Sequence, residues 1–417
     1  MKAILVGVTT KYDKYDIEYS LSELEALAKV LDIETVFKIT QNLDSPNTKT
    51  YIGTGKVDEV IIAINATDAD IVIFNDELTP SQLKHLEEAL KKEVIDRSYL
   101  ILKIFEMRAK TKQSSLEVKL AKDLYLLPRL ELLKGEESRI GGGLYNRGAG
   151  ETQRELDRRH LMAEINHIKN ELLNIKKMKS EQIKRRKRNE IPIVSLVGYT
   201  NSGKSSTMNT ILEYSGSEKQ VLAKDQLFAT LDTANKKVTI DNKDFILVDT
   251  VGFVSKLPHG LVNSFFQTLE EIRYSDLIIV VLDASSQYIK TQYSVVMGVL
   301  EMLKVLDIPT IFLLNKWENT ISESLDIIGK KTIKYSNYTK LNLNELITEI
   351  LSEISASSFN ARLLIPYSKG NLSNILEEKA IIYKKEFQAT GTYFEVEIPS
   401  KIYYLFKDYD LDDIVSW

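Results

Sequence analysis

GYTNSGKS, residues 198–205, is the stretch that decides the fold of the largest part of this chain. It matches the phosphate-binding loop pattern G-x-x-x-x-G-K-[ST], in which backbone N–H groups and a lysine cradle nucleotide phosphates. The flanks agree, because the apolar run IVSLVG leads into the loop and the helical run SSTMNTILEY follows it. A strand, a loop and a helix in this order predict a P-loop domain of the α/β class.

The residue types in this loop predict their roles. Lys204 is expected to reach the β- and γ-phosphates, and the hydroxyl of Ser205 to bind Mg²⁺. We expect the whole loop to surround the nucleotide, which gives the candidate site residues Gly198, Tyr199, Thr200, Asn201, Ser202, Gly203, Lys204 and Ser205.

Three further motifs follow predicted strands downstream of this loop. FILVDTVG (245–252) ends in the D-x-x-G pattern, IFLLNKWE (311–318) is close to the guanine-reading N-K-x-D pattern, and TIKYSN (332–337) places a serine in a fifth loop. Their order is the one expected for GTP-binding domains of the translation-factor class. They add the candidates Asp249, Thr250, Val251, Gly252, Asn315, Lys316, Glu318 and Ser336, with Asp249 near Mg²⁺ and the Gly252 N–H at the γ-phosphate.

Two positions depart from these patterns. Glu318 stands where the guanine-reading residue is usually Asp; its carboxylate can accept both base N–H groups, but its extra methylene leaves the choice between GTP and ATP open. Phe253 follows Gly252, where a Ras-like enzyme has a glutamine that orients the attacking water. We therefore predict slow intrinsic hydrolysis, with the water positioned by another group or by a partner.

The rest of the chain predicts three more units around the P-loop domain, which we place at 191–355. Alternating strand and helix patterns predict an α/β subdomain over 1–112, where Thr79 and Pro80 open one helix. A long helical hairpin with a glycine-rich tip is expected over 113–190, since leucines and isoleucines recur at helical spacing from Leu156 to Ile175. A small α+β domain is expected over 356–417, ending in an exposed acidic tail at Asp410, Asp412 and Asp413.

Composition bounds the class of protein. The chain has 417 residues, a net charge of −4 and no cysteine, which excludes disulfides and thiolate metal sites. No signal peptide and no membrane-spanning run is recognisable, so we expect a cytoplasmic protein. One segment is nevertheless basic: residues 139–188 contain fourteen Lys and Arg against six Asp and Glu. Such a segment is either a solvated helix surface or a local nucleic-acid contact.

At this point the chain resembles a known family, the HflX GTPases. The resemblance rests on GYTNSGKSS, LFATLDTA (227–234) and DTVGFVSKLPHGLVNSFFQTLEE (249–271), and also on YIGTGKVDEV, FNDELTPSQLKHLEE, LPRLE and RIGGGLYNRGAGETQRELDRR (139–159). It implies a GTPase that uses GTP/GDP and Mg²⁺, with Lys204, Thr230 and Gly252 taking part in catalysis. Ser205, Thr230 and Asp249 would bind the metal, and the switch segment would add Phe228, Ala229, Thr230, Leu231 and Asp232 to the nucleotide site.

The resemblance also implies a partner. HflX proteins bind the large ribosomal subunit and can split stalled or idle ribosomes, and the loop between their two long helices reaches toward the peptidyl transferase centre. The stretch 141–150 would then be a tip that contacts rRNA, and the chain would act as a monomer. The candidate rRNA contacts are Gly141, Gly142, Gly143, Tyr145, Arg147, Gly148, Gly150 and Arg154.

Several alternatives stay open at the level of sequence. The chain could be an antibiotic-resistance variant that acts at the peptidyl transferase centre, or a regulatory GTPase switch with a protein partner. GTGK (53–56) could mark a second nucleotide or RNA site in the N-terminal domain, or simply a turn that opens a helix. KRRKR (184–188) could contact rRNA or be a solvated linker between domains.

Overall fold

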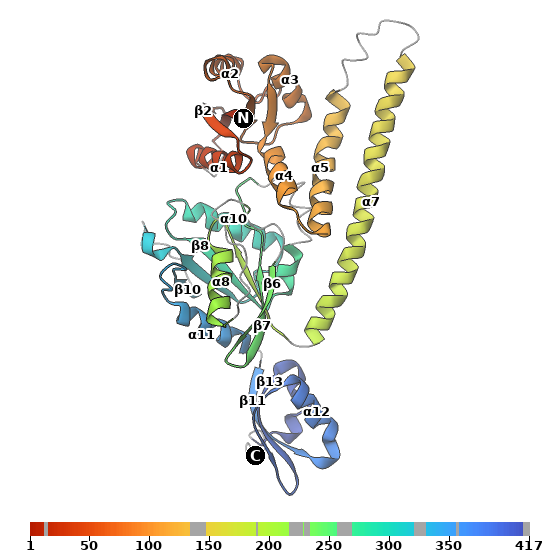
Figure 1. The fold of residues 1–417 in the computed structure, drawn as a ribbon, viewed down its shortest axis with the longest axis vertical. Helices are drawn as coiled ribbons and strands as arrows, with labels where there is room; N and C mark the ends of the chain where they lie inside the picture. Colours follow the sequence, from red (N-terminus) through yellow and green to blue (C-terminus); the bar gives the residue numbers. More distant parts are fainter. Residues whose placement is uncertain are drawn as a thin grey trace.

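The structure is a computed structural model that describes residues 1–11, 16–133, 147–188, 191–216, 228, 234–256, 269–320, 331–355 and 358–411. Its elements have the expected α/β class: an N-terminal α/β unit, two long helices, a central P-loop unit and a small α+β unit (Figure 1). The three sheets are separate, and the long helices run beside the first two units.

The N-terminal unit is a parallel four-stranded sheet in the order β2-β1-β3-β4. Helices cover both faces, so alternate residues of β1 enter two different cores: Ala3 and Leu5 pack with α1 and α4, whereas Ile4 and Val6 pack with α2 and α3. Its elements are β1 (Lys2–Thr9), α1 (Ile17–Val30), β2 (Glu34–Asn42), α2 (Thr54–Thr67), β3 (Ile71–Phe74), α3 (Pro80–Leu90), β4 (Glu93–Asp96) and α4 (Arg97–Arg108).

Local sequence explains where these helices begin. Thr79 caps α3 as predicted, in a capping box with Gln82 and with Pro80 in the first turn. GTGK is the turn that opens α2: Gly53 is the N-cap, its N–H donates to Gln41 Oε1 at 2.9 Å, and Lys56 pairs with Glu59. This contact pattern agrees with the structural interpretation of the motif.

The two long helices are α5 (Lys112–Leu133) and α7 (Arg147–Arg188), which lie antiparallel. Leu120 of α5 packs against Ile165, Ile168 and Leu172, members of the predicted stripe, whereas Leu156 is 45% exposed. Ion pairs Lys112–Glu171 and Lys119–Glu164 fix their register. The backbone of KRRKR is helical and forms the C-terminal end of α7, and its role as rRNA contact or as solvated linker stays a prediction.

The P-loop unit contains a six-stranded sheet in the order β10-β9-β8-β5-β7-β6, parallel except for the β6–β7 pair. Helices α8 and α11 cover one face, and α10 covers the other. Its elements are β5 (Ile193–Gly198), α8 (Lys204–Tyr214), β6 (Ala234–Ile240), β7 (Lys243–Asp249), η1 (Glu270–Tyr274), β8 (Leu277–Asp283), α10 (Ile289–Met302), β9 (Thr310–Asn315), η2 (Trp317–Asn319), β10 (Lys331–Lys334) and α11 (Leu343–Ser355).

The C-terminal unit is an antiparallel sheet in the order β11-β13-β12 with its own apolar core on the helix-covered face. It comprises β11 (Ser358–Pro366), η3 (Tyr367–Lys369), α12 (Gly370–Lys379), β12 (Ile381–Phe387), β13 (Gly391–Pro399), α13 (Ser400–Tyr403) and η4 (Lys407–Tyr409).

The predicted acidic tail is wrong at Asp410. This side chain is only 3% exposed, because the residue bridges to Leu363 of β11 and its carboxylate accepts a hydrogen bond from the Tyr403 hydroxyl at 2.7 Å. Asp412 and Asp413 lie outside the described residues. Across the described ranges, no helix combines the length and apolarity needed to cross a bilayer.

Candidate functional site

The loop 198–205 joins the buried strand β5 to helix α8, as the motif predicts. Both of its glycines are required by close packing. A Cβ on Gly198 would lie 2.2 Å from the Val281 carbonyl oxygen. Gly203 has φ +97°, and a Cβ there would lie 2.1 Å from Asn315 Nδ2. Only glycine allows the backbone to turn this tightly between strand and helix.

Lys204 is the buried cation of the loop. Its ammonium group donates to the carbonyl oxygens of Gly198 at 3.2 Å and Tyr199 at 2.7 Å, so it lies folded over the loop. Burial lowers the pKa of Lys204 to about 8, against the opposing effect of the Asp249 carboxylate. A cation in this position is suited to bind anionic phosphate oxygens.

Oxygen ligands converge beside this lysine. The Ser205 hydroxyl donates to Asp249 Oδ2 at 2.5 Å, and burial raises the pKa of Asp249 although Lys204 and Ser205 lower it. Among the described residues, Asp249 Oδ1, Thr200 Oγ1 and Ser202 Oγ are buried without a hydrogen-bond partner. Buried polar atoms of this kind are normally satisfied. A hydroxyl, a carboxylate and orphaned oxygens at a P-loop fit a hydrated Mg²⁺ and a phosphate group.

The segment 249–256 after β7 is bonded directly to the loop. Thr200 N donates to Phe253 O at 2.7 Å, and Phe253 N donates to Gly198 O at 3.1 Å. A Cβ on Gly252 would lie 2.7 Å from Thr200 Cα and 3.0 Å from Lys204 Nζ. The missing side chain at Gly252 therefore leaves room for the lysine, and the Gly252 backbone lies beside the Lys204 ammonium group.

Phe253 does not face this polar site. Its side chain is 2% exposed and packs in an apolar cluster with Tyr199, Leu269 and Ile272. It therefore serves to anchor the segment in the core, and it offers no group that could orient a water molecule.

The predicted base-reading residues lie at the ends of β9 and β10, next to the same loop. Asn315 Nδ2 donates to Ser202 O at 2.8 Å, and Lys316 pairs with Asp283 Oδ2 at 2.7 Å. Glu318 is exposed in η2, and the buried Ser336 hydroxyl accepts from Thr339 N at 3.0 Å. The structure thus brings Asn315 to the loop 198–205, buries Ser336 in the loop after β10 and leaves the Glu318 carboxylate exposed to solvent.

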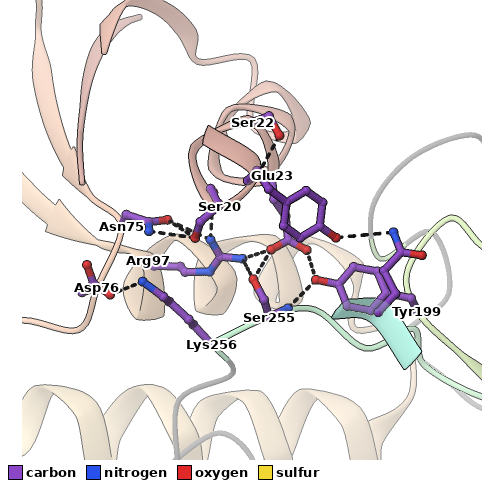
Figure 2. Close-up of polar contacts among 11 residues, drawn as sticks. Ser20, Ser22, Glu23, Asn75, Asp76, Arg97, Tyr199, Ser255 and Lys256 are labelled. Carbon is purple, nitrogen blue, oxygen red and sulfur yellow. Dashed lines mark hydrogen bonds and ion pairs between the residues drawn. The ribbon is translucent and has the colours of Figure 1, made fainter. Parts of the chain in front are cut away.

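A buried polar network joins this site to the N-terminal unit (Figure 2). The Tyr199 hydroxyl donates to Glu23 of α1, and Ser255 N donates to the Tyr199 oxygen at 2.6 Å. Glu23 also accepts from the Ser255 hydroxyl and pairs with Arg97, which is 1% exposed. Burial and the nearby Glu23 carboxylate raise the pKa of Tyr199 well above its usual range, so the phenol stays a proton donor.

Apolar contacts reinforce the same junction. Phe228 is 2% exposed and packs edge-on against Phe105 of α4, with ring centroids 4.6 Å apart. Val251 and Val254 belong to the same cluster as the α1 and α4 core residues. Lys256 adds an ion pair with Asp76. One apolar core therefore includes residues of both units.

Part of the predicted site lies outside the described residues. Ala229, Thr230, Leu231 and Asp232 are in this group, as are Gly141, Gly142, Gly143 and Tyr145 of the expected tip. The backbone is already helical at Arg147, so Gly148 and Gly150 belong to the first turn of α7 instead of a loop. Arg154 follows in the same helix, and the roles of all these residues remain predictions.

Sequence reasoning missed two groups of residues. The first is the Glu23–Arg97–Ser255 network; the signal was present, because Ser20, Glu23 and Leu27 share one face of α1, which predicts a buried carboxylate. The second is Asn337, whose backbone N–H donates to Asn315 Oδ1 at 3.3 Å. Its position directly after Ser336 was the only signal for that contact.

Comparison with protein families divides the chain into three matched regions. Residues 18–106 match the model of a GTP-binding GTPase N-terminal region, residues 108–186 that of a GTP-binding GTPase middle region, and residues 193–316 that of a 50S ribosome-binding GTPase.

Individual relatives match almost the whole chain. GTPase HflX of Caldanaerobacter subterraneus subsp. tengcongensis is 39% identical over 402 residues, covering 96% of this chain and 92% of the relative. GTPase HflX of Escherichia coli is 34% identical over 398 residues, covering 94% and 92%. Among solved structures, a complex of SsGBP with GDP is 26% identical, covers 85% of this chain and 99% of its own, and has a TM-score of 0.48.

Proposed function

The chain belongs to the HflX family of GTPases, and we propose that it binds the large ribosomal subunit and couples its GTP state to the splitting and rescue of ribosomes in the cytoplasm. As a member of that family it hydrolyses GTP to GDP and phosphate. The proposal concerns the partner, the outcome of hydrolysis and the roles of single residues.

At the phosphate end, we assign catalysis to Lys204, Thr230 and Gly252. The buried Lys204 ammonium neutralises charge on the β- and γ-phosphates, and the Gly252 N–H binds the γ-phosphate. The remaining loop residues and Thr250 and Val251 surround the phosphates. The close packing of Gly252 against Lys204, where a Cβ would come within 3.0 Å of the ammonium nitrogen, supports placing both at one phosphate group.

Mg²⁺ would be held by Ser205, Thr230 and Asp249. The 2.5 Å contact between Ser205 and Asp249 and the unpartnered, buried Asp249 Oδ1 support this assignment among the described residues. When bound, the ion would neutralise charge that develops on the phosphate oxygens.

At the base end, Asn315, Lys316, Glu318 and Ser336 would select guanine. Glu318 is exposed and carries a carboxylate that can accept the two N–H groups of the base edge. Asn315 already bonds to the Ser202 carbonyl oxygen, so the residue that would contact the base is fixed to the loop that would contact the phosphates.

Intrinsic hydrolysis should be slow, because the Phe253 side chain is buried in the apolar cluster and cannot position water. We propose that the ribosome stimulates turnover by supplying or ordering the missing group. If the ribosome sets the rate of GTP hydrolysis, the protein would consume GTP mainly when it is bound to a ribosome.

The observation that carries the ribosome proposal is the helical hairpin. The ion pairs Lys112–Glu171 and Lys119–Glu164 are consistent with a single antiparallel register of α5 and α7. In this register the end of α5 at Leu133 lies level with the first turn of α7. With 42 residues, α7 is about 63 Å long at 1.5 Å per residue. It forms a strut that leads from the P-loop unit past the N-terminal sheet (Figure 1).

A glycine-rich tip at the end of a basic strut suits a narrow RNA target. Residues 139–188 hold eight more cationic than anionic side chains, and the glycines of 141–150 permit close approach of backbone to RNA. We assign rRNA contact to Gly141, Gly142, Gly143, Tyr145, Arg147, Gly148, Gly150 and Arg154.

The test measures GTP hydrolysis with and without large ribosomal subunits, and light scattering of intact ribosomes. We expect faster hydrolysis and a GTP-dependent fall in scattering. A chain that shows neither stimulation nor splitting would refute the proposal.

A second measurement separates RNA binding from binding of a protein partner. Replacing Arg147, Arg154 and Arg158 by Gln should weaken subunit binding and reduce its salt dependence by about one unit of slope per lost phosphate contact. The matched control replaces the exposed Lys2, Lys29 and Lys91 of the N-terminal unit by Gln and should leave subunit binding unchanged. Equal binding by both triple variants would favour the alternative of a regulatory switch.

The fold limits the alternative of a protein partner, because a partner that contacted Val251, Val254 or Ser255 would have to displace the N-terminal unit, which already packs on these residues. The antibiotic-resistance alternative has its own test. A role in antibiotic resistance predicts a higher minimum inhibitory concentration for drugs of the peptidyl transferase centre when the gene is present.

A further inference from the structure

Asn337 connects the base end of the site to the helix that begins at the phosphate loop. It follows Ser336 in the loop after β10, and its side chain is half-buried. Its carboxamide reaches α8: Nδ2 lies 3.3 Å from the Gly203 carbonyl oxygen and 3.2 Å from Thr207 Oγ1. On the other side, Asn337 Oδ1 lies 3.2 Å from the Thr210 hydroxyl, whose proton is shared between this oxygen and the Ser206 carbonyl oxygen at 3.0 Å.

The orientation of this carboxamide is determined by its neighbours. The Gly203 carbonyl can only accept, so the group that faces it must be the NH₂ and not the oxygen. The Thr207 hydroxyl already donates to Gly203 O at 2.9 Å, which leaves its oxygen to accept from Asn337. A carboxamide fits this position, because its NH₂ donates to Gly203 and Thr207 and its oxygen faces Thr210.

The backbone of Asn337 completes a closed path. Its N–H donates to Asn315 Oδ1 at 3.3 Å, while Asn315 Nδ2 donates to Ser202 O at 2.8 Å. Asn337 and Asn315 therefore both hold the loop 198–205: Asn315 bonds to Ser202, and Asn337 bonds to Gly203 and to Thr207 of α8.

We propose that Asn337 is a positioning residue for guanine recognition. Its side chain fixes the loop 336–339 to α8, so the groups that read the base stay in register with those that hold the phosphates. This role rests on the proposed assignment of Asn315, Lys316 and Glu318 to the base, and it adds a determinant of specificity that contacts α8.

The experiment compares the full-length chain with N337A and N337D by displacement of a fluorescent GDP analogue with GDP, IDP and ADP. IDP lacks the 2-amino group, so the ratio of its Kd to that of GDP reports on base reading. The matched control is Y338A, because Tyr338 is the next residue and is 87% exposed. Thermal unfolding without nucleotide shows that each variant folds.

We expect N337A to weaken GDP binding about 5- to 30-fold, as for the loss of one to two net hydrogen bonds. We also expect it to lower the ratio of the Kd of IDP to the Kd of GDP by at least about threefold. N337D should be worse than N337A although it is isosteric, because a carboxylate oxygen would face the Gly203 carbonyl. Y338A should match the wild-type chain. If the asparagine variants do not fold, T210V should shift affinity and ratio less, in the same direction.

Two results would overturn the role. An unchanged IDP/GDP ratio in N337A would mean that the side chain supports the phosphate loop alone, and an N337D chain that binds like wild type would remove the hydrogen-bonding argument. A wild-type chain that binds ADP as tightly as GDP would instead refute the base assignment, and this role with it.

Discussion

At the scale of single residues, the end of the site that would hold the phosphates depends on a glycine with no side chain and on a buried lysine. Gly252 leaves room for Lys204, and Lys204 is held by two loop carbonyls. The ammonium group is therefore buried and held in position before nucleotide binds, which is the condition under which one charge contributes most.

We expect G252A to lower kcat for GTP hydrolysis about tenfold or more, because the new methyl group would meet the Thr200 backbone at 2.7 Å and displace Lys204 or the segment after β7. Steady-state phosphate release measures this. G298A is the matched control, since a Cβ on Gly298 in α10 meets nothing within 4 Å. Equal rates for both variants would contradict the packing argument.

Nucleotide affinity should fall as pH rises above about 8. Burial lowers the pKa of Lys204 to about 8 in the free protein, and bound phosphates would favour the ammonium form. The complex then holds more protons than the free chain, so affinity drops by up to tenfold per pH unit above this pKa. Calorimetry of GDP binding in buffers with different ionisation enthalpies should detect proton uptake at pH 9 and less at pH 7. Uptake independent of pH would exclude Lys204 as its source.

At the scale of elements, the junction between α1, α4 and the segment after β7 combines charge with apolar packing. Glu23 and Arg97 are both nearly inaccessible to solvent. From the P-loop unit, Ser255 bonds to both side chains and Tyr199 bonds to Glu23. A buried pair of this kind is sensitive to the loss of one partner.

E23Q should destabilise the chain by about 3–5 kcal/mol, because it leaves the Arg97 guanidinium buried without its counter-charge. The urea-unfolding transition of the N-terminal and P-loop units measures the change. E164Q, which removes the exposed pair with Lys119 between α5 and α7, should change stability by no more than about 1 kcal/mol. A small effect of E23Q would mean that water reaches the junction.

Elements with strong periodicity or special loops were predictable from the sequence, and contacts between distant segments were not. The loop 198–205, the capping of α3 by Thr79 and the pairing of α5 with α7 follow from local patterns of glycines, caps and apolar spacing. Burial of Phe228 against Phe105 could not be predicted, because neither residue carries a local signal for the other. The prediction that Asp410 is exposed was wrong for the same reason. Its partner Tyr403 lies in another element, and an aspartate near the end of the sequence is normally predicted to be exposed.

At the scale of the whole molecule, the C-terminal unit is the most independent part. Its apolar core is distinct from that of the P-loop unit, and the contacts between the two units include the ion pair of Lys243 with Glu397 at 3.1 Å. The nucleotide loop lies at the opposite end of the P-loop sheet from this junction (Figure 1).

A chain that ends at Ser355 should therefore bind GDP within about twofold of the full-length protein, because it keeps α11 and the whole P-loop core. Titration with a fluorescent GDP analogue tests this, and circular dichroism checks that the shorter chain is folded. A loss of affinity above about tenfold would show that the C-terminal unit supports the nucleotide site.

The shared core of the first two units limits how such proteins can be recombined. Phe228, Val251 and Val254 belong by sequence to the P-loop unit but pack with α1 and α4. A chimera that joined the first 190 residues of one relative to the remainder of another would set foreign side chains into that core. The natural unit of exchange is therefore the N-terminal region together with the segments around 228 and 249–256, so these distant stretches should be inherited as a matched set.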